Sequence, residues 1–212
     1  MIDPARLRGL YVITDRRLCP SEIMSDQVSQ ALAGGARIVQ YRDKSQDHER
    51  RIREATTLRA LCEEYQALLI INDDVALARR VMAHGVHLGE DDASLSSARE
   101  ILGADSVIGI SCYNSLERAR SASQEGADYL AFGRFFPSTT KPLAVNADPA
   151  LLTRAKRELN RPLVAIGGIT PENGAPLIGA GADMLAVVHG VFGQPDISEA
   201  CRRMTALFSP QE

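Results

Sequence analysis

Eight short apolar segments recur along the chain, and each is followed by a longer stretch of mixed polar and apolar residues. The segments read GLYVIT, ARIVQY, ALLIIN, GVHLG, SVIGIS, DYLAFG, PLVAIGG and MLAVVHG. They lack the strict alternation of a strand with one solvated face, so they are typical of strands covered on both sides. Strands of this kind that alternate with helices predict a parallel sheet.

Eight strand-helix units in 212 residues fit an α/β fold of one type, a (β/α)8 TIM barrel near the small end of its size range. A doubly wound open sheet would also alternate, but it usually has fewer strands, and no GxGxxG motif follows the first segment. No low-complexity segment or Pro/Ser/Gly linker divides the sequence. We therefore predict one domain over residues 1–212, with a core from about residue 8 to about residue 208.

The charge balance argues against a nucleic-acid partner. Lys and Arg number 24 against 27 acidic residues, which leaves a net charge of −3 and no basic surface of the usual kind. The four cysteines are scattered without a CxxC pair, and the first residues contain no apolar signal segment. No apolar run approaches the ~20 residues of a membrane span. We expect a soluble, cytoplasmic protein with small-molecule partners, no membrane association and reduced thiols, for which a homo-oligomer is one option.

The second segment ends in QYRDK, which brings two cations and an amide to one place. Alternation along a strand sends Gln40, Arg42 and Lys44 to one side and Tyr41 and Asp43 to the other. An arginine fork and a lysine ammonium together match a phosphate or a pyrophosphate. The alternative is an exposed strand end in which Arg42 pairs with Asp43.

The third and fourth segments end in NDD and HLGEDD, which gather five carboxylates at neighbouring strand ends. A divalent cation would relieve their repulsion, and a set of oxygen ligands completed by substrate phosphates points to Mg²⁺. The alternative role for an acid here is to cap the following helix. We expect capping by Asp74 and Asp91, and metal binding by Asp73 and Asp92.

Three further strand ends carry possible binding groups. Gly167-Gly168 and Gly190 would expose backbone N–H groups after the last two strands, the usual phosphate site of a barrel, although a tight turn alone could explain the glycine pair. AFGRFFPSTTKP adds hydroxyls and Lys141 after the sixth strand.

The four histidines show no zinc-binding spacing. We expect His87 to be a hydrogen-bonded core residue, and His48 and His84 to be surface residues.

The motifs VQYRDK, INDD, HLGEDD, GIS, ADYLAFGRFFPSTTKP, AIGGIT and GADMLAVVHGVF occur in an order and spacing that resemble the thiamine phosphate synthase family, with matches from about Gly9 to Phe192. The resemblance implies a TIM barrel that joins hydroxymethylpyrimidine diphosphate to thiazole phosphate, releases pyrophosphate and requires Mg²⁺. In that family the leaving pyrophosphate produces a delocalised pyrimidine cation, which the thiazole nitrogen captures.

The resemblance also implies a set of site residues. The pyrimidine diphosphate site falls on Gln40, Arg42, Lys44, Asn72, Ser111 and Lys141, with Arg42, Lys44 and Lys141 stabilising the departing charge; the metal ligands fall on Asp73 and Asp92; the thiazole phosphate site falls on Ser138, Thr140, Gly168, Val188 and His189. The sequence departs from the common family pattern at Glu90, Tyr113 and His189, where many members have Gln, His and Ser.

Three other functions fit parts of the pattern. A related thiazole tautomerase would isomerise the thiazole phosphate and would need an acid or base where Tyr113 now stands. A catalytically silent barrel that binds thiamine phosphates would not need the lysines and acids. A sugar-phosphate epimerase would share the last two strand ends but has no reason for Lys141.

Overall fold

The computed structural model describes residues 3–137 and 146–209. Eight parallel strands close into a barrel in the order β1-β2-β3-β4-β5-β6-β7-β8, as the sequence predicts. Their bounds are Gly9–Ile13, Ile38–Tyr41, Leu68–Asn72, Gly85–Leu88, Val107–Tyr113, Tyr129–Gly133, Leu163–Ile166 and Met184–Val187. Strands β1 and β8 pair directly, Leu10 beside Leu185, so the sheet has no free edge. The prediction that residues 1–212 form one domain stays a prediction.

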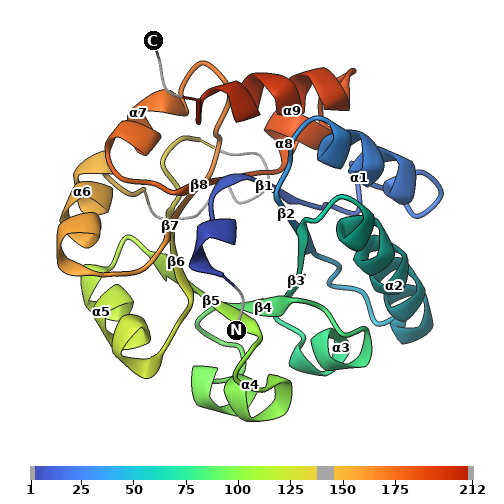
Figure 1. The fold of residues 1–212 in the computed structure, drawn as a ribbon, viewed down its shortest axis with the longest axis horizontal. Coiled ribbons are helices and arrows are strands. Elements are labelled where there is room, and N and C mark those ends of the chain that lie inside the picture. Colours follow the sequence, from blue (N-terminus) through green and yellow to red (C-terminus); the bar gives the residue numbers. More distant parts are fainter. Residues whose placement is uncertain (1–2, 138–145, 210–212) are drawn as a thin grey trace.

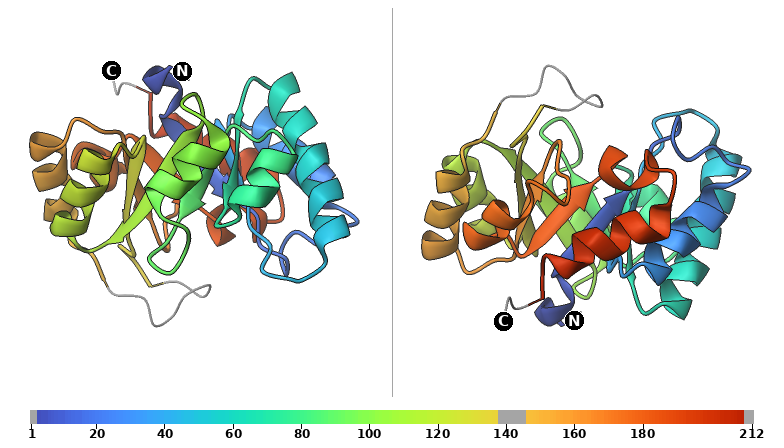
Figure 2. Two further views of the ribbon diagram at one scale, coloured as in Figure 1. Left: turned by 90° about the horizontal axis from the view of Figure 1, so that it is seen from below. Right: turned by 90° about the horizontal axis from the view of Figure 1, so that it is seen from above.

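Helices ring the barrel; α1 to α7 each connect one strand to the next, and α8 and α9 follow the last strand (Figure 1). Their bounds are Met24–Ala33 (α1), His48–Glu64 (α2), Val75–Arg80 (α3), Leu95–Leu102 (α4), Leu116–Glu125 (α5), Pro149–Glu158 (α6), Ala175–Gly179 (α7), His189–Phe192 (α8) and Ile197–Ala206 (α9). A short 3-10 helix, η1 (Pro4–Arg6), lies at one end of the barrel, and the loop after β1 lies at the other (Figure 2). Within the described part of the chain, no helix has both the length and the apolar character that crossing a bilayer requires.

The core has two layers. An inner layer fills the barrel and includes Tyr11, Ile38, Ile70, Tyr129 and Met184. An outer layer lies between the strands and the helices and is larger. All strands except β4 contribute to both layers through alternate residues, which is why most of the segments read as nearly continuous apolar runs.

Side-chain caps fix where several helices begin. Asp47, Asp74 and Ser94 accept hydrogen bonds from backbone N–H groups at the starts of α2, α3 and α4, at 3.0, 2.8 and 3.2 Å. The expected cap at Asp74 is confirmed. The expected cap at Asp91 is wrong, because Ser94, three residues later, takes that position and leaves Asp91 exposed.

One glycine makes room for a large side chain inside the barrel. Gly109 of β5 lies beside Tyr129 of β6 in the sheet register. A Cβ added to Gly109 would lie 1.9 Å from Cζ of the Tyr129 ring. The glycine is therefore required for Tyr129 to lie across the barrel interior.

Candidate active site at the carboxyl end of the barrel

A cavity of ≈ 550 Å³ opens at the carboxyl ends of the strands. Every predicted site residue that the structure describes lines it: Gln40, Arg42, Lys44, Asn72, Asp73, Asp92, Ser111, Gly168, Val188 and His189. These residues come from six different strand ends, as expected for a barrel active site. Ser138, Thr140 and Lys141 lie outside the described residues.

The exit of β2 carries the cationic side of the cavity. The predicted alternation is confirmed, because Gln40, Arg42 and Lys44 line the cavity while the Tyr41 hydroxyl donates to Glu54 on α2 at 2.6 Å. Asp43 also points to α2, where it pairs with Arg50 at 2.8 Å. The alternative pairing of Arg42 with Asp43 is therefore wrong.

Asp73 and Asp92 face each other across the exits of β3 and β4. Lys44 donates to Asp73, and Asp92 accepts the N–H of Gly89 at 2.6 Å. Burial raises the pKa of Asp92, and the neighbouring Asp73 carboxylate raises it further. Burial also disfavours the Asp73 anion, but hydrogen bonds from Lys44 and Asp92 outweigh it and hold the pKa of Asp73 below its ordinary value.

The two carboxylates fit a hard divalent cation. They share a hydrogen bond at the mouth of a cavity that Arg42 and Lys44 also line, so an ion held there would lie next to the groups predicted to bind phosphate. Among the described residues, no group of three or more His, Cys, Asp or Glu side chains could hold a metal. An ion at Asp73 and Asp92 would therefore complete its shell with water and substrate oxygens, the usual arrangement for Mg²⁺.

A chain of hydrogen bonds forms the floor of the cavity. Gln40 donates to the Tyr11 hydroxyl at 2.6 Å, which contacts the Tyr129 hydroxyl at 2.9 Å. The Tyr129 hydroxyl lies 3.0 Å from Nδ1 of His87, and Nε2 of His87 lies 2.8 Å from the Ser111 hydroxyl. Burial raises the pKa of both tyrosines, so they remain neutral hydrogen-bonding groups. The chain links two of the predicted substrate ligands, Gln40 and Ser111, through side chains in the barrel interior.

Sequence reasoning missed Tyr11 and Tyr129 as parts of this site. A tyrosine at an inward position of a barrel strand needs a polar partner for its hydroxyl, and that requirement was the available signal. His87 is hydrogen-bonded inside the barrel, as expected, but it also lines the cavity. His84 is only partly exposed and accepts the Leu69 N–H at 2.9 Å, so the expectation of a surface residue is wrong.

The exits of β7 and β8 carry the glycine side of the cavity. Gly168 has φ of 63°, and a Cβ there would lie 2.3 Å from the carbonyl oxygen of Pro137. Close packing against Pro137 therefore requires a glycine here whether or not a ligand binds, and the role of Gly168 in phosphate binding stays a prediction. Val188 precedes α8, and His189, its first residue, is exposed at the cavity mouth with its carbonyl held by Gln194 at 3.1 Å.

Two of the departures from the family pattern contact each other at the cavity rim. The Glu90 N–H donates to the Tyr113 hydroxyl at 3.3 Å. The Arg118 guanidinium lies 5.8 Å from the Tyr113 ring centre and 4.0 Å from the Glu90 carboxylate. Glu90 and Tyr113 therefore form one local cluster with Arg118.

The family described as thiamine monophosphate synthase matches residues 10–191. The chain belongs to this family. Among curated members, the thiamine-phosphate synthase of Nitrosococcus oceani is 56% identical over 92% of this chain and 89% of its own length. That of Thioalkalivibrio sulfidiphilus is 53% identical over 96% of both chains. The resemblance read from the motifs is thus confirmed.

A solved structure of the same family has the same fold. The thiamine phosphate pyrophosphorylase of Pyrococcus furiosus aligns with a TM-score of 0.88 and 36% identity over 97% of both chains. The fold of this relative agrees with the closed eight-stranded barrel described above.

Proposed function

We propose that the protein is a thiamine-phosphate synthase, a transferase of thiamine biosynthesis. It condenses hydroxymethylpyrimidine diphosphate with thiazole phosphate and releases thiamine phosphate and pyrophosphate. Membership of the family supports this function. The structural observation that carries it is the convergence of the predicted phosphate-binding cations, acid pair and glycines on one cavity of ≈ 550 Å³.

The residues divide into two substrate sites. Arg42 and Lys44 bind the diphosphate, with Lys141 as a third cation, and Gln40, Asn72 and Ser111 orient the pyrimidine ring. Gly168, Val188 and His189 bind the thiazole phosphate through backbone and imidazole donors, together with the hydroxyls of Ser138 and Thr140. The cavity thus holds the diphosphate at one side, the thiazole phosphate at the other and the two rings between them.

Asp73 and Asp92 would hold Mg²⁺, which when bound stabilises negative charge on the diphosphate oxygens. The bond from the pyrimidine methylene carbon to the diphosphate breaks, and its electron pair leaves with pyrophosphate. Arg42 and Lys44 stabilise that charge as it develops. The thiazole nitrogen then donates its lone pair to the pyrimidine cation, and the new carbon–nitrogen bond completes thiamine phosphate without a protein nucleophile.

The remaining properties follow from this assignment. The partners are two small phosphorylated substrates, and neither a nucleic acid nor a membrane is involved. A biosynthetic enzyme of this kind acts in the cytoplasm, where its four cysteines, all buried, are reduced. Assembly into a homo-oligomer is compatible with all of these roles.

The test is pyrophosphate release by the purified protein with Mg²⁺. We expect release only when both substrates are present, and none from either alone or after chelation of the metal. Absence of turnover with both substrates would refute the proposal. Adding the thiazole tautomer as a separate substrate distinguishes an isomerase, which would convert it without any pyrimidine diphosphate.

A lysine comparison links the activity to this cavity. Lys44 is 62% exposed on its side chain and lies at the mouth, so Lys44→Ala should lower kcat/KM by about 10- to 100-fold with little change in Tm. Lys156 makes a comparable exposed ion pair with Asp183 but does not line the cavity, and Lys156→Ala is the matched control. Equal effects of the two substitutions would contradict the assignment of Lys44. Lys141→Ala is expected to behave like Lys44→Ala.

A further inference from the structure

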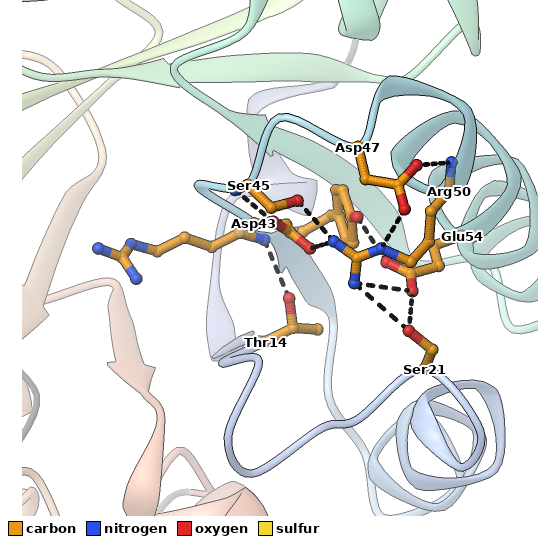
Figure 3. A network of polar contacts seen from close by, with 9 residues as sticks. Thr14, Ser21, Asp43, Ser45, Asp47, Arg50 and Glu54 are labelled. Atoms are coloured by element: carbon orange, nitrogen blue, oxygen red, sulfur yellow. Dashed lines mark hydrogen bonds and ion pairs between the residues drawn. The ribbon is translucent and has the colours of Figure 1, made fainter.

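A nearly buried arginine on the first turn of α2 lies directly behind the loop that leaves β2 (Figure 3). The Arg50 side chain is 14% exposed. One of its terminal nitrogens donates to Asp43 at 2.8 Å and to Ser45 at 2.5 Å. The other faces Ser21 at 3.4 Å and Glu54 at 3.7 Å. The third nitrogen, Nε, lies 3.4 Å from the Asp47 carboxylate, so all three nitrogens of the guanidinium have protein partners.

Both carboxylate oxygens of Asp43 also have protein partners. Its side chain is 2% exposed, and its second oxygen accepts the N–H of Ser45 at 2.6 Å. Burial opposes ionisation, but the Ser45 donors and the Arg50 charge outweigh it and lower the pKa of Asp43. A carboxylate buried to this extent requires its cationic partner, so Asp43 and Arg50 fix each other's position.

The same loop carries the cations of the cavity. Arg42 and Lys44 line the cavity, while Asp43 and Ser45 point to Arg50. In an extended segment, alternate side chains point to opposite sides, so holding one set determines the direction of the other. The Arg42 N–H donates to Thr14, the residue after β1, at 2.9 Å, which gives the backbone of this loop a second attachment.

The neighbouring residue acts in the same way on the next loop. Arg51 pairs with Asp74 at 2.8 Å, and Asp74 caps α3 directly after Asp73. Two consecutive arginines of α2 therefore bind the loops that follow β2 and β3. The first turns of one helix support both the phosphate-binding cations and the acid pair.

We propose that Arg50 is a positioning residue that aims Arg42 and Lys44 at the diphosphate of the pyrimidine substrate. The identity of that substrate rests on the proposed function. Arg50 does not line the cavity, so it acts through Asp43 and Ser45 and not on the substrate. Donors that are already fixed in direction lose less freedom when a diphosphate binds, and this is the source of the affinity that Arg50 provides.

The experiment measures binding of inorganic pyrophosphate with Mg²⁺ by calorimetry and, separately, the KM of each substrate. The variants are Arg50→Lys, which keeps the charge but not the planar fork, and Arg50→Met. Arg59→Lys is the matched control, because Arg59 lies on the same helix and pairs with Glu63 at 2.6 Å with a side chain 22% exposed, away from the cavity.

We expect both Arg50 variants to weaken pyrophosphate binding by about tenfold or more. They should raise the KM for the pyrimidine diphosphate by a similar factor. The KM for thiazole phosphate should not change. Arg59→Lys should leave all three values unchanged. In a background lacking the Arg42 and Lys44 side chains, Arg50→Lys should weaken pyrophosphate binding no further, because the groups that it positions are gone.

Some results would overturn the proposal. One is a folded Arg50→Lys protein that binds pyrophosphate within twofold of the wild type; another is an equal rise of both KM values. If both Arg50 variants fail to fold, Ser45→Ala removes one of the same hydrogen bonds with less disruption and must still weaken pyrophosphate binding selectively. Pyrophosphate binding needs no turnover, so failure of the proposed reaction would be seen separately in the wild-type assay.

Discussion

Removing the hydroxyl of Tyr129 tests the chain of hydrogen bonds under the cavity. The hydroxyl contacts Tyr11 at 2.9 Å and His87 at 3.0 Å, and the tyrosine is fully buried. Tyr129→Phe keeps the ring, which packs against Gly109, so no large cavity forms. Two buried hydrogen bonds at about 1 kcal/mol each give a loss of about 2 kcal/mol in unfolding free energy. For a domain of this size, that loss lowers Tm by about 4–8 °C.

Urea unfolding of the wild type and Tyr129→Phe measures the loss directly, provided that the m-values agree. The matched control is Tyr65→Phe, since Tyr65 is 37% exposed and, within the described residues, its hydroxyl contacts Ser29 alone, at 3.3 Å. The control should change the free energy by less than about 0.5 kcal/mol. Tyr11→Phe should resemble Tyr129→Phe, and the double variant should cost less than the sum because the two share one bond. A Tyr129→Phe effect no larger than that of Tyr65→Phe would refute the structural role of the chain.

Two further predictions concern histidines. Burial, followed by the charges of Arg59 and Arg6, lowers the pKa of His84 to about 4. In the unfolded chain His84 takes up a proton near pH 6.5, so its contribution to the free energy of unfolding is complete above that pH. This contribution is lost as the pH falls toward 4, by about 2 kcal/mol after allowance for partial exposure. His84→Gln should flatten this part of the curve of unfolding free energy against pH, and an unchanged slope would contradict the assignment. His189→Ala should raise the KM for thiazole phosphate by about tenfold with Tm and the KM for the pyrimidine diphosphate unchanged, and a shift in both KM values would argue against a local phosphate contact.

The barrel was predictable from the sequence because its signal is repeated eight times. Apolar runs covered on both faces, each followed by a helix, leave few alternatives to a closed parallel sheet. Placing residues at the carboxyl ends of strands then brings together side chains as distant in sequence as Gln40 and His189. That step needs only the fold and the alternation of side chains along a strand.

Contacts between elements were harder to predict. The choice of Ser94 over Asp91 as a cap depends on where α4 begins, a boundary that composition leaves uncertain by a few residues. The partner of Asp43 lies seven residues away on a helix, and nothing in QYRDK distinguishes Arg50 from Arg42 as that partner. The tyrosine chain joins strands that are far apart in sequence, so no local pattern reports it.

The pairing of β1 with β8 has a consequence for synthesis of the chain. Leu10 is made early, but its neighbour Leu185 leaves the ribosome about 175 residues later, which takes roughly 10–35 s at usual translation rates. Until then, the nascent sheet has two open edges, and the growing chain exposes strand backbone that could pair with other chains. Closure is also the contact of highest sequence separation in the sheet, so it adds the largest loop-closure cost to folding. A nascent chain that stops before Met184 is therefore an open sheet and not a smaller barrel.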